Sequence, residues 1–93
     1  MLDGAPLGPP SPFRSWTLYL LECSDGSWYA GITNDLNRRM QAHASGRGAR
    51  YTRARPPRRL LATRSFPDRS AASKAEWVLK QLPRHRKLGF FEI

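Results

Sequence analysis

The chain has 93 residues, which is near the small end of domains that fold alone. Its single cysteine excludes an internal disulfide framework and a multi-thiolate zinc site, and no apolar run approaches the ~18 residues expected of a membrane span. The formal net charge is +9, and 13 of the 16 basic residues are arginine, whose planar fork binds phosphate bidentately. A polyanionic partner, nucleic acid, is therefore expected, and an anionic membrane surface is the weaker alternative.

Residues 1–13 predict a disordered leader, because they hold four of the eight prolines and two of the seven glycines. The leader lacks the apolar segment and the basic start of a secretory signal. We therefore expect one folded domain over residues 14–93 and a cytoplasmic protein.

The next two segments predict a β-hairpin. Residues 16–23 and 27–33 are rich in aromatic and aliphatic side chains, and the Ser-Asp-Gly sequence between them is a turn signal. Cys23 ends the first segment and is expected to be a small buried hydrophobe.

The length of the hairpin loop decides where Tyr19 and Tyr29 point. A two-residue loop would put the two phenols on opposite faces of the hairpin. A three-residue loop with Gly26 in the left-handed region would pair Tyr19 with Gly31 and put both phenols on one face. We predict the three-residue loop, which leaves on the other face Leu18, Leu20, Trp28, Ala30 and Ile32.

An Asn-Asp pair then predicts the start of a helix over residues 36–44. Its apolar residues recur every four positions and are expected to face the core: Leu36, Met40 and Ala44. Arg39 and His43 are also four residues apart and share an adjacent stripe, whereas Arg38 lies about 100° away around the helix.

Residues 49–57 predict a basic loop that ends at a double proline. Between positions 38 and 64 the chain has nine arginines and no carboxylate, which is typical of a surface that binds a polyanion. Tyr51 stands among these arginines and is either a base-stacking side chain or a loop anchor. The residues expected to bind nucleic acid are Arg38, Arg47, Arg50, Tyr51, Arg53 and Arg55.

Residues 58–66 predict a third strand, and residues 70–82 a second helix capped by Ser70. The core face of this helix is expected to hold Ala71, Ala75, Val78 and Leu82, with Glu76 beside that stripe. Residues 84–89 are expected to form a last basic turn or short helix. The order β-β-α-β-α predicts an α+β domain in which helices flank a three-stranded, largely antiparallel sheet.

Four side chains could form a phosphodiesterase site if the fold brings them together: Tyr19, Tyr29, Arg39 and Glu76. A phenol can transfer a proton, and a guanidinium stabilises the charge that builds up on a phosphorane. One carboxylate is enough to hold Mg²⁺ when water and phosphate supply the other ligands. The alternatives are packing tyrosines and an i,i+4 ion pair between Glu76 and Lys80. His43 could add a general base, a proton donor or a phosphate ligand.

Over residues 16–83 the chain resembles the GIY-YIG nuclease superfamily, in particular its small stand-alone bacterial members. Thr17 and Leu18 stand where the family has glycine and isoleucine, and Ala30 replaces the middle residue of the second tripeptide. The segments that carry the resemblance are Thr17-Leu18-Tyr19, Tyr29-Ala30-Gly31-Ile32-Thr33, the helix 36–43, Gly48-Ala49-Arg50-Tyr51-Thr52, and Phe66-Pro67-Asp68-Arg69-Ser70 leading to Glu76.

The resemblance implies a metal-dependent endonuclease. On matching positions Tyr29 or Tyr19 would help to activate water, Arg39 would stabilise the phosphorane, and Glu76 would hold one Mg²⁺ (or Mn²⁺). His43 would be a further active-site residue. The expected substrate is DNA, in branched, flapped or damaged structures during repair or recombination. The alternatives are a nucleic-acid-binding module with weak catalysis, a protein that binds structured RNA, and a subunit that needs a protein partner for activity.

Overall fold

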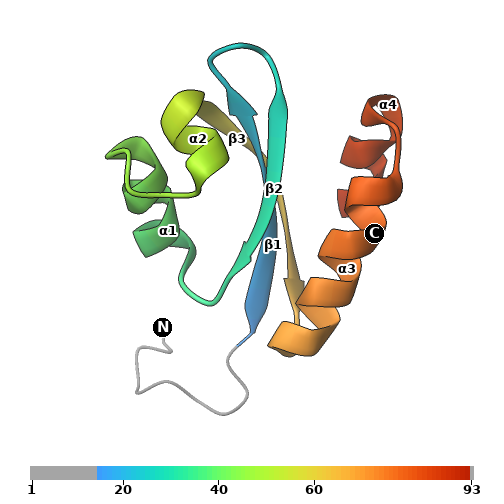
Figure 1. Ribbon diagram of the computed structural model, residues 1–93. Helices are drawn as coiled ribbons and strands as arrows, with labels where there is room; N and C mark the ends of the chain where they lie inside the picture. Colours follow the sequence, from blue (N-terminus) through green and yellow to red (C-terminus); the bar gives the residue numbers. More distant parts are fainter. Residues whose placement is uncertain (1–14, 93) are drawn as a thin grey trace.

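The computed structural model describes residues 15–92, so the expected leader at 1–13 lies outside the described residues. A three-stranded antiparallel sheet in the order β2-β1-β3 forms the middle layer. Figure 1 shows α1 and α2 on one side of this sheet and α3 and α4 on the other, which confirms the α+β prediction. The elements are β1 (Trp16–Cys23), β2 (Trp28–Thr33), α1 (Leu36–Ala44), α2 (Arg50–Ala54), β3 (Pro57–Phe66), α3 (Arg69–Gln81), α4 (Arg84–Lys87) and the 3-10 helix η1 (Leu88–Phe91).

The hairpin has the three-residue register that the sequence predicts. Tyr19 lies opposite Gly31, and Leu21 lies opposite Tyr29. Gly26 has a φ of 84°, and its N–H donates to the Cys23 carbonyl at 2.9 Å, which closes the turn. Both phenols therefore lie on one face of the sheet.

The apolar core lies between the sheet and α3. It contains Leu18, Leu20 and Ala30 from the hairpin together with Ala75 and Leu79 from α3, and all five are buried. Cys23 is also fully buried, as predicted. Burying these side chains stabilises the packing of α3 against the sheet face that carries no phenol.

The predicted inward face of α3 is confirmed at Ala75, which is buried, and at Leu82, which packs against the core, but two of its positions are wrong by one residue. Ala72 is buried in place of Ala71, and Leu79 is buried while its neighbour Val78 is 43% exposed. The helix begins at Arg69 because the Asp68 carboxylate, and not Ser70, caps it by accepting from the Ala71 N–H at 2.8 Å.

The inward face of α1 also differs from the prediction. Asp35 caps this helix as expected, and its carboxylate accepts from the Arg38 N–H at 3.1 Å. The buried residue of α1 is His43, however, whereas Ala44 is exposed and Leu36 is only half-buried, like Met40. A polar side chain can take the buried position here because both ring nitrogens find partners inside the protein.

The prediction of a simple loop over residues 49–57 is wrong, because α2 forms within them. This single helical turn covers the hairpin face that carries the phenols. Among residues 15–92, no helix is long and apolar enough to cross a membrane.

Candidate active site

Four of the five candidate catalytic side chains meet on the face of the sheet beneath α1 and α2. The ring centroids of Tyr19 and Tyr29 are 6.5 Å apart, and the imidazole of His43 lies 5.7 Å from the first ring and 5.6 Å from the second. Arg39 reaches the same place from one turn earlier on α1, and its Nε–H donates to the Tyr19 hydroxyl at 3.4 Å. The hairpin register and the four-residue spacing on α1 together bring these groups into contact.

Hydrogen bonds link this cluster to α2. His43 Nε2 lies 2.9 Å from the Tyr19 hydroxyl, and His43 Nδ1 lies 2.7 Å from Thr52 Oγ1. The Thr52 hydroxyl donates to the Ala49 carbonyl at 3.0 Å. Tyr19, His43 and Thr52 are each at most 2% exposed, so water has little access to these bonds. Thr52 could not be identified as a site residue from the sequence, because only the position of α2 reveals its contact with His43.

The protonation states follow from burial and from Arg39. Burial raises the pKa of Tyr19, which the hydrogen bond from Arg39 partly opposes, so the phenol keeps its proton at neutral pH. Burial and the Arg39 charge lower the pKa of His43, so the imidazole is neutral. The hydrogen bond to Tyr19 raises the pKa of Arg39, which stays charged.

Two glycines make room for the cluster. Gly31 lies beside the Tyr19 ring, where an added Cβ would be 2.6 Å from the phenol Cζ. Gly48 lies against the imidazole, where an added Cβ would be 2.9 Å from His43 Cε1. Both distances are shorter than any normal carbon contact, so neither position can take a side chain unless the ring moves.

Replacing Gly31 with alanine is expected to lower the free energy of unfolding by about 1–3 kcal/mol, the usual cost of overpacking. The reason is that the Tyr19 ring is buried and hydrogen-bonded, so it cannot move aside cheaply. Gly89→Ala is the matched control, because a Cβ there meets nothing within 4 Å. Urea denaturation measures both; equal stability of the two variants would contradict the prediction.

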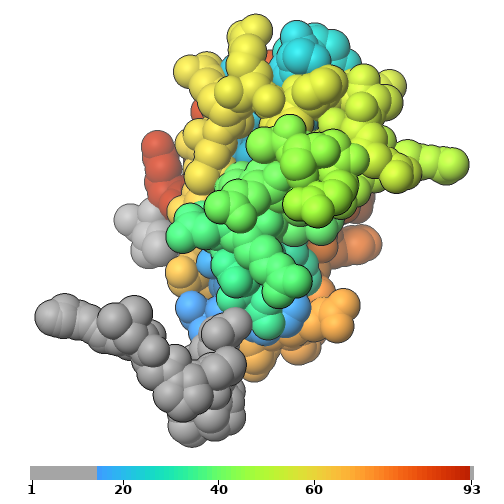
Figure 2. All heavy atoms as spheres, turned by 90° about the vertical axis from the view of Figure 1, so that its left-hand side faces the viewer, coloured from blue at the N-terminus to red at the C-terminus, as the bar shows by residue number. Residues whose placement is uncertain are grey.

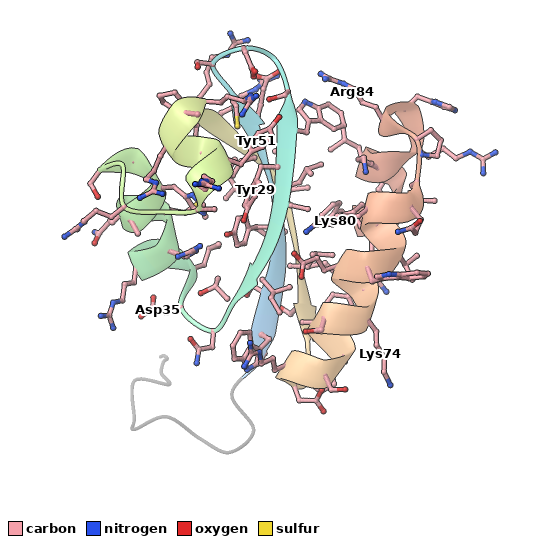
Figure 3. All side chains as sticks on the ribbon, viewed as in Figure 1. Tyr29, Asp35, Tyr51, Lys74, Lys80 and Arg84 are labelled. Carbon is pink, nitrogen blue, oxygen red and sulfur yellow. The ribbon has the colours of Figure 1, made fainter. Side chains whose placement is uncertain are left out.

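Tyr51 lies against Tyr29, between β2 and α2 (Figure 3). The two rings stack with centroids 5.8 Å apart, and the Arg55 guanidinium lies 4.4 Å from the centre of the Tyr51 ring. Arg55 also pairs with the Asp25 carboxylate of the hairpin turn at 3.1 Å. This arrangement agrees with the loop-anchor interpretation of Tyr51, since much of the ring surface is already in contact with protein.

Several arginines of the basic stretch also serve the fold. Arg59 donates to the Glu22 carboxylate at 2.9 Å, and Arg64 donates to the Phe90 carbonyl at 2.9 Å. Figure 2 looks onto the layer of α1 and α2 (green), from which long side chains project into solvent. The arginines of this layer that are exposed and make no ion pair within residues 15–92 are Arg38, Arg47, Arg50 and Arg53.

An open hollow of about 410 Å³ lies beside the first half of α1. Arg39, which contacts the buried cluster, also forms part of the wall of this hollow, and Arg38 provides a second guanidinium there. The hollow is the concave surface next to the cluster where a phosphate could contact Arg39. Its lining residues are Thr33, Asn34, Asp35, Arg38, Arg39 and Ala42.

Glu76, the fifth candidate, comes from the other helical layer and has no hydrogen bond to the other four in the described residues. It belongs to α3, in the opposite helical layer, and its carboxylate pairs with Lys80 Nζ at 3.0 Å. Figure 3 shows Lys80 extending from α3 toward the sheet, while Lys74 extends away from it. The charge on Glu76 nevertheless adds to the rise in the pKa of Tyr19, after the larger effect of burial. The tyrosines, Arg39 and His43 are thus linked by ring contacts and hydrogen bonds, and the charge of Glu76 acts on Tyr19, so the role of Glu76 as a metal ligand stays a prediction.

The side chains of the candidate site fit a divalent metal ion only if a single carboxylate holds it. Within residues 15–92 no group of three or more His, Cys, Asp or Glu side chains could enclose an ion. A lone carboxylate suits Mg²⁺, which commonly keeps several waters and takes the remaining oxygens from substrate phosphate. Glu76 has this character, provided that Lys80 releases it.

Known proteins similar to this chain share both its sequence and its fold. A UPF0213 protein of Xanthomonas campestris is 62% identical over 79 residues, which cover 85% of this chain and 78% of that protein. The solution structure of the UPF0213 protein BH0048 from Bacillus halodurans has a TM-score of 0.51 at 49% identity, covering 81% of this chain and 80% of that one. The solution structure of EF2693 from E. faecalis has a TM-score of 0.59 at 42% identity, covering 83% and 82%.

The GIY-YIG catalytic domain family matches residues 15–88, a range that includes Tyr19 and Tyr29 of the hairpin, α1 and Glu76. Each helix and strand that contributes to the cluster falls inside this range. With its tyrosine hairpin, its arginine helix and this match, the chain belongs to the GIY-YIG family.

Proposed function

We propose that this protein is a divalent-metal-dependent endonuclease that hydrolyses phosphodiester bonds in branched or damaged DNA. The observation that carries the proposal is the convergence of two phenols, one imidazole and one guanidinium from β1, β2 and α1. Family membership supports a nucleic-acid substrate. The preference for DNA structure over DNA sequence fits a surface that offers guanidinium groups for phosphates.

In this proposal the scissile phosphate lies in the hollow beside Arg39. The Nε–H of Arg39 donates to Tyr19, which orients the guanidinium, and its terminal amino groups would bind the phosphate oxygens as negative charge develops. Tyr29 is more exposed than Tyr19 and, as the phenolate, would take the proton of the attacking water. The water oxygen bonds to phosphorus while the bond to the leaving oxygen breaks. Glu76 would hold Mg²⁺ or Mn²⁺, which supplies Lewis-acid stabilisation when bound.

The test is a cleavage assay with the wild-type protein on a four-way junction, a flap, a linear duplex and a structured RNA of equal length. We expect incision of the branched DNA in Mg²⁺ and none after chelation with EDTA. An Arg39→Ala protein purified in the same way reveals any contaminating nuclease. Cleavage that persists in EDTA, or that is equal in the two proteins, would refute the proposal.

A second candidate is a nucleic-acid-binding module without catalysis. The ion pair between Glu76 and Lys80 favours it, because the carboxylate that would hold the metal is already neutralised. This candidate predicts salt-dependent binding to DNA and RNA alike with no cleavage in Mg²⁺ or Mn²⁺. Cytoplasmic location and a protein partner needed for activity stay predictions.

A further inference from the structure

The hydrogen bonds around His43 form one continuous chain whose two ends have fixed roles. At one end is the Ala49 carbonyl, which can only accept a hydrogen bond. At the other end is Arg39 Nε–H, which can only donate one. Between them lie Thr52, His43 and Tyr19, each of which can do either.

Starting from the carbonyl, the direction of each bond can be deduced. Thr52 has one hydroxyl proton and donates it to Ala49, so Thr52 Oγ1 must accept from His43 Nδ1. A neutral imidazole carries one proton, which is then on Nδ1, and Nε2 is left as an acceptor. The phenol proton of Tyr19 therefore points at His43 Nε2.

The guanidinium end is compatible with this answer. Because Arg39 Nε donates to the Tyr19 oxygen, the phenol turns a lone pair toward Arg39 and is free to turn its proton toward His43. When it does so, the ring nitrogen that faces it is an acceptor, and all four bonds are satisfied in a single arrangement.

We propose that Thr52 is a positioning residue, which holds His43 in the Nδ1–H tautomer and through it orients the Tyr19 hydroxyl toward His43 and its lone pair toward Arg39. The opposite tautomer would point an N–H at the Tyr19 oxygen and leave the buried phenol proton without an acceptor. A buried donor left unpaired loses its hydrogen bonds to water and gains none in return, which disfavours that tautomer.

The surroundings of His43 prevent the ring from escaping this constraint. Gly48 lies against the imidazole, and the ring is 2% exposed, so it has no room to flip toward solvent. Thr52 is held in turn by α2, whose N-cap residue Ala49 supplies the accepting carbonyl. The short helix α2 thus places one hydroxyl group against one ring nitrogen.

The tautomer can be measured directly by long-range ¹H–¹⁵N NMR on the full-length protein labelled with ¹⁵N-histidine. The chain has only two histidines, and exposed His85 serves as an internal reference for a solvent-averaged ring. We expect His43 to give the Nδ1–H pattern in the wild type and in Thr52→Ser. Thr52→Val keeps the shape but removes the acceptor, and we expect it to shift His43 toward the Nε2–H pattern.

An Nε2–H or averaged pattern for His43 in the wild type would overturn the inference without any variant. An unchanged Nδ1–H pattern in a folded Thr52→Val protein would overturn it as well. These NMR readouts need no enzymatic activity, so their outcome does not depend on the proposed nuclease function. Only the catalytic consequence of the inference rests on that function.

That consequence is a selective loss of kcat. In Thr52→Val we expect kcat to fall by about 10–100-fold, as when the partner that orients a metal-binding histidine is removed, while KM changes little. Thr52→Ser should restore most of the rate, because it restores the accepting oxygen. Equal kcat in Thr52→Val and wild type, with cleavage present, would show that the orientation of Tyr19 has no catalytic role.

Discussion

Replacing Arg39 with alanine is expected to lower kcat for DNA cleavage by about 10²–10³-fold, the usual cost of removing one group that stabilises charge in the transition state. Arg39 both donates to Tyr19 in the tyrosine–histidine cluster and lines the hollow. Arg39→Lys is expected to recover only part of the rate, since an ammonium keeps the charge but lacks the planar fork. Single-turnover kinetics at saturating protein measure the chemical step.

Arg38→Ala is the matched control for Arg39. Arg38 is its neighbour in the chain and lines the same hollow, yet its side chain has no hydrogen bond to either phenol in the described residues. We expect it to raise KM and weaken the salt dependence of binding, while kcat is retained. If the two variants lose kcat equally, the arginines act as a general phosphate clamp, and the assignment of Arg39 to the reacting phosphate is wrong.

Replacing Glu76 with glutamine is expected to reduce metal-dependent cleavage to the level of wild type in EDTA. Glutamine keeps the shape of the side chain but removes the negative charge that would hold the ion. The fold should be nearly unaffected, because the lost ion pair with half-exposed Lys80 is worth about 0.3–0.5 kcal/mol. Glu92→Gln removes an exposed carboxylate from the end of the described chain and controls for net charge.

Lys80→Met tests whether the ammonium competes with the metal for Glu76. We expect this variant to bind Mn²⁺ at a lower concentration than wild type does. The midpoint of the paramagnetic broadening of NMR signals near Glu76 measures that concentration. Calorimetric titration with Mg²⁺ gives the same comparison without Mn²⁺. Cleavage by Glu76→Gln at the wild-type rate would remove Glu76 from the site and would strengthen the case for a different metal position.

The hairpin could be predicted from the sequence because its register depends on local information. The length of one loop and one left-handed glycine decide which side chains share a face, and both are visible in Ser24-Asp25-Gly26. The start of α1 was likewise predictable from the capping side chain of Asp35. These two local features put both tyrosines on one face and Arg39 within α1, and the docking of α1 on that face then brings Arg39 to Tyr19.

The inward faces of the helices could not be predicted in the same way. Hydrophobic periodicity assigns the core side of α1 to Met40 and Ala44, whereas a network of hydrogen bonds buries His43. Helix α2 has no apolar period in Arg-Tyr-Thr-Arg-Ala, and its Tyr51 stacks on Tyr29, a contact between separate elements that no local pattern reveals. Thr52 carries no signal of its own, since its partner is nine residues away on another helix.

Finally, the strand order has a consequence for when the site exists during synthesis. The cluster of Tyr19, Tyr29, Arg39, His43 and Thr52 is complete in the chain by residue 52, yet β1 is the central strand and pairs with β3 only after residue 66. A nascent or truncated chain that ends earlier has every one of these side chains but an unpaired edge on β1 and no α3 over the core. Because such distant contacts must form before the sheet is stable, we expect a fragment that ends before residue 66 to lack the assembled cluster, although it contains every one of its side chains.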